Sequence, residues 1–253
     1  MNKRACVFQH TPWEGPGRNL LAGCQRHGLR LEIVRVWQER IPDLTPYAAL
    51  IVLGGSPNVD EEDRYPFLRP EKEAIARSLA DDRPYLGFCL GHQLLADALG
   101  ARVGKNFTPS LGFITGHVTE AGREHPALAH LDHRFPLFKW HGQTVLEPLP
   151  HNLTVLMTSA ECQVEAIGVA GRPHLLGLQF DNHAGSPEEV AGFLASDRSW
   201  FEAMVAGKDL APERILADAR QHQDIIAGQF HRFFDNFVTL AGIAPAGARK
   251  RTA

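Results

Sequence analysis

Continuous apolar runs alternate with helical segments through the first part of the chain, and this alternation constrains the fold more than any other feature. The runs cover residues 4–8, 31–36, 48–53 and 84–88. Segments 19–27 and 66–81 between them have the apolar spacing of amphipathic helices. Strands that are apolar on both faces are typical of a parallel sheet covered by crossover helices. The sequence therefore predicts an open α/β fold with a mostly parallel sheet and helices on both faces.

Past residue 110 the apolar runs become shorter and alternate with polar residues. The expected strands are 113–119, 134–139, 153–158, 164–169 and 174–180. Gly171 and Arg172 lie between the last two, as in a hairpin turn. The sequence thus predicts an added antiparallel layer that returns to the main sheet at 175–180.

The last part of the chain is predicted to be helical. Ser186, Pro187 and Glu189 have the spacing of a capped helix start, and a further helix should begin near Pro212. Apolar residues recur in this further helix at helical spacing: Ile226, Phe230, Phe233, Phe234 and Phe237. Such a stripe must pack against another surface, and docking on the parent domain is favoured over a groove for a partner.

The length of 253 residues and the hydrophobic content of 44% allow a sizeable buried core. The chain fits one large α/β domain, or one domain with an appendage. We expect a domain at 1–185, a helical extension packed on it at 186–243, and a flexible tail at 244–253.

The charge balance excludes several classes of partner. A net charge of -3 and a pI near 6.5 give no long-range attraction to phosphate backbones or anionic lipids. No apolar stretch approaches the roughly 20 residues that span a bilayer, and the start does not resemble a signal peptide. We therefore expect a cytoplasmic protein that binds small molecules or proteins, but neither nucleic acid nor membrane.

Cysteine and histidine usage predicts no cofactor or metal. The four cysteines lie far apart without a CxxC pair, so neither a disulfide framework nor a zinc ribbon is expected. All except Cys89 are best explained as core thiols. His125, His130 and His133 share one loop without a carboxylate in register, which favours ordinary surface histidines.

Gly87, Cys89 and Gly91 form a G-x-C-x-G pattern between a predicted buried strand and a predicted helix. In that context the pattern is typical of a nucleophile elbow, whose sharp turn strains the backbone of its central residue. The turn leaves the thiol at a helix N-terminus, where amide dipoles favour the thiolate. Cys89 is therefore the candidate nucleophile. The alternative is an inert cysteine buried in a tight turn.

Gly54 and Gly55 follow the third predicted strand, and ligands of open α/β sheets bind outside the carboxyl ends of strands. A Gly-Gly turn there can direct a backbone N–H at the cavity. With the N–H of Leu90 it would form a pair of donors for a tetrahedral oxyanion. The alternative is that the two glycines only turn the chain.

Four segments resemble the class I glutamine amidotransferases in order and spacing. They are Leu53-Gly54-Gly55, 84–96, Trp140-His141-Gly142 and Gly177-Leu178-Gln179-Phe180. The similarity covers about residues 4–183, is greatest with stand-alone GMP-synthase-like amidotransferase domains, and includes a helical extension like 187–240. It implies a flavodoxin-like fold and hydrolysis of the side-chain amide of glutamine, or a related γ-glutamyl bond, through a γ-glutamyl thioester.

The resemblance also implies roles for individual residues. Cys89 would be the nucleophile, and Gly55 and Leu90 would form the oxyanion hole. The residues implied for substrate binding are Gly54, Gln93 and Gly142. His141 resembles a structural position of the family rather than the general base. His92, in the first turn of the predicted helix, is better explained as a packing or capping residue.

The sequence departs from the family pattern after Phe180. The family carries its catalytic histidine next and an orienting glutamate two residues later, whereas this chain has Asp181 and His183. Aspartate is a poor base for a thiol, because the reference pKa of its carboxyl group is about 3.9 and that of a thiol is about 8.5. Transfer of the proton from the thiol to the carboxylate is therefore unfavourable. In a continuing strand these two residues would lie about 6 to 7 Å apart. Only a bend at 182–185 would allow a Cys89–His183–Asp181 triad with exchanged roles.

Three functions follow from this mixture. The leading hypothesis is an amidotransferase-type hydrolase of glutamine or a γ-glutamyl compound, which could pass ammonia to a separate synthase. Its rival is a catalytically impaired homologue that keeps Cys89 for binding, regulation or redox sensing. The third is a different cysteine chemistry on the same scaffold, with an acidic partner for the thiol.

Overall fold

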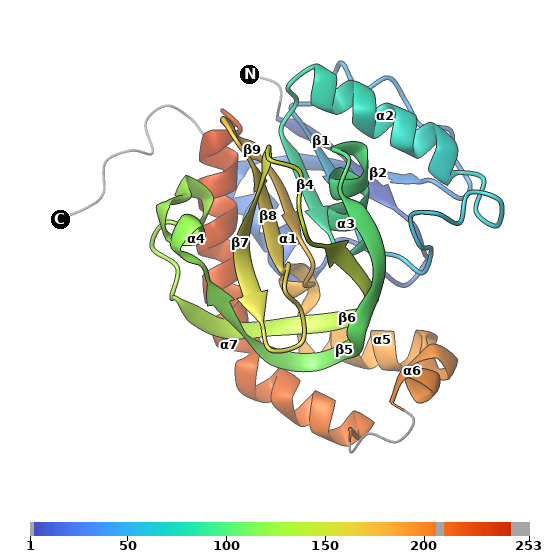
Figure 1. The fold of residues 1–253 in the computed structure, drawn as a ribbon, viewed down its shortest axis with the longest axis vertical. Coiled ribbons are helices and arrows are strands. Elements are labelled where there is room, and N and C mark those ends of the chain that lie inside the picture. Colours follow the sequence, from blue (N-terminus) through green and yellow to red (C-terminus); the bar gives the residue numbers. More distant parts are fainter. Residues whose placement is uncertain (1–2, 206–209, 244–253) are drawn as a thin grey trace.

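The computed structural model describes residues 3–205 and 210–243 (Figure 1). Within them, one sheet has the strand order β2-β1-β3-β4-β9-β8-β7-β5-β6. Its parallel part consists of β1 (Arg4–Gln9), β2 (Arg30–Arg35), β3 (Ala49–Val52), β4 (Tyr85–Phe88) and β9 (Arg172–Leu178). The predicted α/β class is confirmed.

The remaining strands are antiparallel and continue the same sheet. They are β5 (Arg102–Val118), β6 (Arg134–Leu146), β7 (Leu153–Ser159) and β8 (Ala166–Val169). Gly171 has a φ of 72° in the turn between β8 and β9, as the hairpin prediction requires. β5 and β6 are longer than predicted, because polar residues such as the fully buried Lys139 interrupt their hydrophobic pattern.

Helices cover both faces of the parallel strands. α1 (Arg18–His27) and α7 (Pro212–Leu240) lie on one face, and α2 (Leu68–Ala80) and α3 (Leu90–Ala98) lie on the other. Successive residues of β1 show the alternation. Val7 belongs to the core that contains Phe234 of α7, whereas Phe8 belongs to the core that contains Leu94 of α3. The predicted coverage of both faces is confirmed.

The C-terminal helices begin where the sequence predicts. Ser186 and Glu189 form a reciprocal capping box at the start of α5 (Pro187–Ser196), which α6 (Arg198–Met204) follows. All five residues of the apolar stripe on α7 are buried, and the Phe230 ring lies 6.1 Å from that of Phe88 in β4. The stripe therefore docks on the sheet, as expected. The predicted tail at 244–253 lies outside the described residues.

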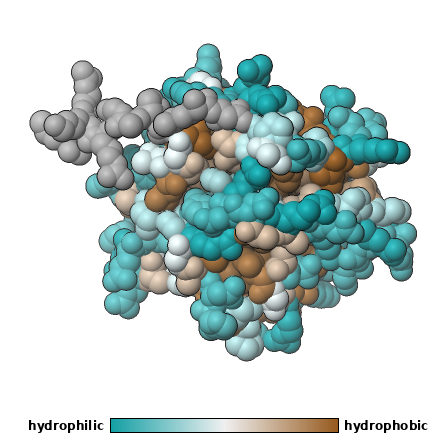
Figure 2. Space-filling model, turned by 90° about the horizontal axis from the view of Figure 1, so that it is seen from above, coloured by the Kyte–Doolittle hydropathy of each residue, from teal (hydrophilic) through white to brown (hydrophobic). Residues whose placement is uncertain are grey.

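The short helix α4 (Glu120–Glu124) and two 3-10 turns, η1 (Pro126–Leu128) and η2 (Asn182–Ala184), complete the elements. On the face seen in Figure 2, hydrophilic side chains surround scattered hydrophobic patches. No helix in the described part of the chain combines the length and the apolar content needed to cross a membrane.

Candidate active site

Cys89 lies in a strained turn between β4 and α3. Its φ is 44° and its ψ is -103°, a conformation that non-glycine residues rarely adopt. Its backbone N–H donates to the carbonyl oxygen of Leu178, at 2.9 Å, which ties the turn to β9. A Cβ on Gly87 would lie 2.4 Å from the carbonyl of Gly91, and a Cβ on Gly91 would lie 2.2 Å from the oxygen of Val52. Both glycines are therefore needed for the elbow to form.

The Gly54–Gly55 turn is held from behind by a buried ion pair. His10 donates from Nδ1 to the carbonyl oxygen of Gly54 (2.8 Å), and its Nε2 lies 2.8 Å from Glu71 Oε1. Burial opposes a charged ring, but the charge of Glu71 and these hydrogen bonds raise the pKa of His10 above its ordinary value. Since a trans peptide directs its C=O and N–H oppositely, the N–H of Gly55 points away from His10.

A cavity of about 250 Å³ opens in front of the elbow. Cys89, Gly55, Gln93 and Gly142 all line it. Gln93 is fixed within it, because its Nε2 donates to the carbonyl oxygen of Gln143 (3.0 Å) and to the side-chain oxygen of Gln179 (3.2 Å). The structure therefore brings Cys89, Gly55, Gln93 and Gly142 together at one cavity, whereas Gly54 and Leu90 are not among its described lining residues.

The chain bends sharply after β9. Asp181 donates its N–H to the carbonyl oxygen of Phe138 in β6 (2.9 Å), and Asn182 accepts the N–H of Phe138 (2.7 Å) and donates to the carbonyl oxygen of Pro136 (3.0 Å). These bonds hold η2 against β6. The bend that the exchanged triad would require at 182–185 is therefore present.

The bend pairs His183 with Asp181 and leaves the sulfur without an imidazole. His183 Nε2 lies 3.6 Å from Asp181 Oδ1, and both side chains are fully buried. The other ring nitrogen, Nδ1, accepts the N–H of Gly17 (3.2 Å), and the ring lies 4.4 Å from that of Phe88. Among the described residues, no histidine is hydrogen-bonded to Cys89 Sγ. The triad role of His183 and Asp181 stays a prediction.

The surroundings of Cys89 favour the neutral thiol. Burial raises its pKa well above the ordinary value, and the nearby charges of Asp181 and Glu14 raise it further. The charge of Lys139 and the N–H of Leu90 act in the opposite direction, without reversing the shift. The helix N-terminus therefore does not make this thiol acidic.

Two other histidines near the elbow are neutral packing residues. Burial lowers the pKa of His92 to about 3, and its ring leaves no room for a Cβ on Gly177 of β9. His141 donates from Nδ1 to the carbonyl oxygen of Gln143 (2.8 Å), and burial holds its pKa well below the ordinary value. In the part of the chain that the structure describes, neither ring is hydrogen-bonded to Cys89 Sγ.

One buried cluster has potential metal ligands. Single ligand atoms of His141, Cys162 and Glu165 lie within 4.8 Å of one another. The ammonium of Lys139, however, forms a buried ion pair with Glu165. A metal ion there would have to displace this cation or lie beside it, so the Lys139–Glu165 pair is the better description of the cluster.

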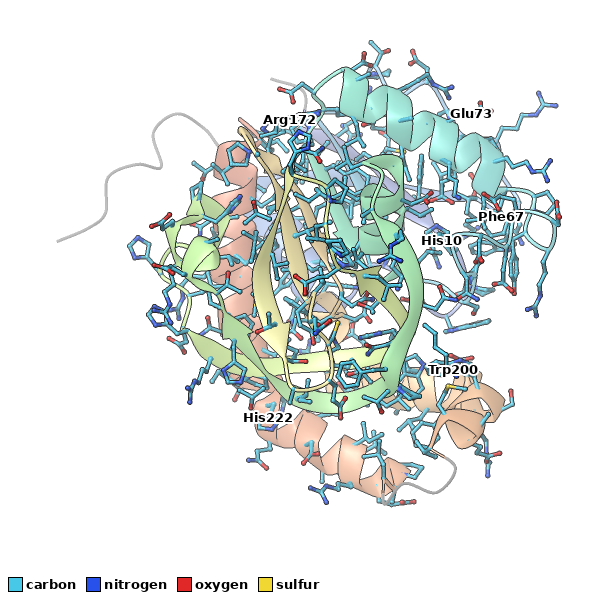
Figure 3. The ribbon with its side chains drawn as sticks, in the orientation of Figure 1. His10, Phe67, Glu73, Arg172, Trp200 and His222 are labelled. Carbon is cyan, nitrogen blue, oxygen red and sulfur yellow. The ribbon has the colours of Figure 1, made fainter. Side chains whose placement is uncertain are left out.

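Several residues of the cavity could not be recognised from the sequence. Trp13 and Glu14 enter it from the β1–α1 loop, and Phe193, Asp197 and Trp200 enter it from α5, the α5–α6 junction and α6. In Figure 3, Trp200 comes from α6, beside the β5 and β6 ribbons. The position of the β1–α1 loop at the carboxyl end of a parallel strand was the available indication of a role.

Comparison with known proteins agrees with this geometry. Residues 17–184 match the family model described as glutamine amidotransferase class-I. The chain is 33% identical over 124 residues to the glutamine amidotransferase-like protein YfeJ of Salmonella typhimurium, covering 48% of this chain and 51% of that protein. It is 27% identical over 158 residues to one subunit of the glutamine-hydrolyzing GMP synthase of Methanocaldococcus jannaschii, covering 59% and 77%.

The chain spans about half the length of the first of these curated relatives, and 28% of the GMP synthase of Thermomicrobium roseum.

Solved structures show the same fold. A glutamine amidotransferase from Thermotoga maritima superposes with a TM-score of 0.82 at 22% identity, covering 94% of this chain and 99% of that one. One from Methylobacillus flagellatus superposes with a TM-score of 0.84 at 19% identity over 100% of both chains.

The protein defined by this fold and family match belongs to the class I glutamine amidotransferases. Both the resemblance found in the sequence motifs and the expected flavodoxin-like fold are thereby confirmed.

Proposed function

We propose that the chain binds glutamine, or a related γ-glutamyl compound, in front of Cys89, and that its hydrolytic step is impaired. The observation that carries this proposal is a formed elbow and cavity whose sulfur has carboxylates nearby and, among the described residues, no imidazole hydrogen-bonded to it. In binding, the side-chain amide carbonyl of the ligand would face the N–H groups of Gly55 and Leu90.

The impairment follows from the proton balance of thioester chemistry. Sγ must lose a proton to attack the amide carbon, and the leaving ammonia must gain one. By the motif resemblance, Asp181 stands where the family carries its histidine. Moving a proton from an ordinary thiol to an ordinary carboxylate costs about 6 kcal/mol from their reference pKa values. The raised pKa of Cys89 increases this cost.

A second candidate is an active hydrolase with the two roles exchanged. It is supported by the distance of 3.6 Å between His183 Nε2 and Asp181 Oδ1, and by the bend that turns η2 back on β6. In this alternative the ring of His183 moves to the sulfur when substrate binds, and Asp181 orients it. Attack by Sγ gives the thioester and ammonia, and water then releases glutamate.

Two wider assignments belong to the same proposal. Released ammonia would pass to a separate synthase, by analogy with the relative named as one subunit of a glutamine-hydrolyzing GMP synthase. We also propose the division into a domain at 1–185 and an extension at 186–243, since α5 and α6 close one side of the cavity.

The test is glutamate release from glutamine by four proteins: wild type, Cys89→Ala, His183→Ala, and the double variant Asp181→His/His183→Glu. Restoring the family residue types should increase the rate at least about 100-fold over wild type, since a positioned base contributes 10²- to 10⁴-fold. Covalent labelling of Cys89 by a chloromethyl ketone analogue of glutamine reports pocket formation independently. Fast wild-type turnover that is lost in His183→Ala would replace the main proposal with the second candidate.

A further inference from the structure

Two carboxyl groups line the cavity in front of Cys89. Glu14 and Asp197 both line it, and none of its described lining residues is a lysine or an arginine. Its one histidine, His141, is kept neutral by burial. The buried cation Lys139 is already paired with Glu165, and the buried His10 ring is already paired with Glu71. The described lining therefore offers carboxyl groups but no unpaired cation.

Glu14 is the least compensated of these groups. It is 7% exposed, lines the cavity, and forms no hydrogen bond with any described residue. Its carboxyl fits only because Gly54 lacks a side chain: a Cβ there would lie 1.8 Å from Glu14 Oε1 and 3.2 Å from Cys89 Cβ. Burial, together with the charges of Asp181 and Asp197, raises the pKa of Glu14 well above its ordinary value. A bound cation would remove this penalty.

Aromatic rings complete the wall. Trp13, Trp140, Phe193 and Trp200 line the same cavity, and the rings of Trp140 and Trp200 lie 5.8 Å apart with an interplanar angle of 44°. Trp140 Nε1 donates to Asp197 Oδ2 (3.0 Å), which fixes this carboxylate beside the indole. Indole faces attract ammonium groups through their quadrupole, most strongly where water is excluded.

We propose that the cavity selects γ-glutamyl amides whose amine portion carries an organic ammonium group, held between Glu14, Asp197 and the indoles. The inference rests on the proposed function, because the γ-glutamyl carbonyl is assigned to the oxyanion donors beside Cys89. The cationic amine portion then occupies the carboxylate-lined and aromatic part of the same cavity.

The test compares two probes of equal shape by isothermal titration calorimetry on the full chain. Choline carries a quaternary ammonium group, and 3,3-dimethylbutan-1-ol is its neutral carbon isostere. Choline should bind roughly 10-fold more tightly than the alcohol, in line with a desolvated cation–π site beside a carboxylate. Equal binding of the two probes by wild type would overturn the inference without any variant.

Variants locate the site. Asp197→Asn and Trp200→Leu should each weaken choline binding several-fold while leaving the alcohol unaffected. The matched control is Glu188→Gln, which removes an exposed carboxylate of α5 outside the cavity lining. Equal weakening by Glu188→Gln would show attraction by net charge alone and overturn the site.

Labelling of Cys89 by the glutamine analogue separates this inference from the proposed function. If the analogue labels Cys89 but the protein does not prefer choline to the alcohol, the ammonium site is contradicted and the proposed function is not. If the protein prefers choline but is not labelled and does not bind glutamine, the γ-glutamyl assignment is contradicted and an ammonium site in the cavity remains.

Discussion

Two neighbouring segments at the carboxyl end of the central strands differ in how well they match the family pattern that the sequence motifs resemble. The elbow after β4 keeps its strained cysteine and both glycines, whereas the segment after β9 carries Asp181 and His183 where the family resemblance expects histidine and glutamate. Both leave the sheet side by side, since Phe88 is in register with Leu178. The backbone of such a site can therefore be present without the side chains that the family uses for its chemistry.

The physical reason for the difference is steric. Within the elbow, each glycine faces backbone atoms that cannot move aside. After β9, the bonds to β6 come from the backbone N–H of Asp181 and from the Asn182 side chain, whereas the buried His183 ring holds η2 by accepting the N–H of Gly17. The Asp181 side chain forms none of these hydrogen bonds, so substitutions should affect stability at the elbow and reactivity at Asp181.

The largest expected effect is on stability at the elbow. Gly91→Ala places a Cβ against the backbone oxygen of Val52 in β3, and should lower the free energy of unfolding by more than about 3 kcal/mol. Urea denaturation followed by circular dichroism measures it.

The matched control is Gly192→Ala in α5, where no heavy atom outside the adjoining helix backbone lies within 4 Å of the new Cβ. This change should stabilise the protein by about 0.5–1 kcal/mol, because alanine favours the helix. If Gly91→Ala behaved like its control, the backbone of the elbow would not be sterically determined.

The second prediction concerns the reactivity of Cys89. Because burial and the charges of Asp181 and Glu14 raise its pKa, iodoacetamide should modify it slowly at neutral pH and faster as the pH rises. Asp181→Asn removes one of these charges, which lowers the pKa and should speed modification at neutral pH roughly 3- to 10-fold. Mass spectrometry of the Cys89 peptide gives the rate.

Asp63→Asn serves as the reference for this experiment, since that carboxylate is 97% exposed in its side chain. It should leave the rate unchanged. A rate that Asp181→Asn does not increase would mean that the carboxylate after β9 has no electrostatic effect on the elbow.

The contrast also explains what the sequence could predict. The elbow was recognisable because its constraints are local, with glycine spacing and a strand-to-helix transition lying within a few residues. The positions of Glu14 and Trp200 depend on how the β1–α1 loop and α6 pack around a cavity formed by distant strands, and no local pattern encodes that packing. The predicted end of strand β6 at Lys139 was wrong for the same reason. A lysine can be buried within this strand because its partner Glu165 comes from another part of the chain.

The smallest expected effect tests the support behind the elbow. His10 has a raised pKa because of Glu71, so it stabilises the folded chain fully below the pKa of the unfolded state, near 6.5. This contribution is lost as the pH rises through the folded-state pKa, which lies above that value. The free energy of unfolding of the wild type should therefore fall as the pH rises from 6 to 9. This fall should exceed that of the His10→Gln variant by on the order of 1 kcal/mol.

Urea denaturation at several pH values measures this difference, and the glutamine analogue reports its consequence for the site. A glutamine side chain at position 10 cannot form an ion pair with Glu71, so the peptide between Gly54 and Gly55 should be held less firmly and Cys89 labelled more slowly. Parallel pH profiles for the two proteins would show that the ion pair contributes nothing to folding. Unchanged labelling would show that the elbow and its oxyanion donors are set by the sheet alone.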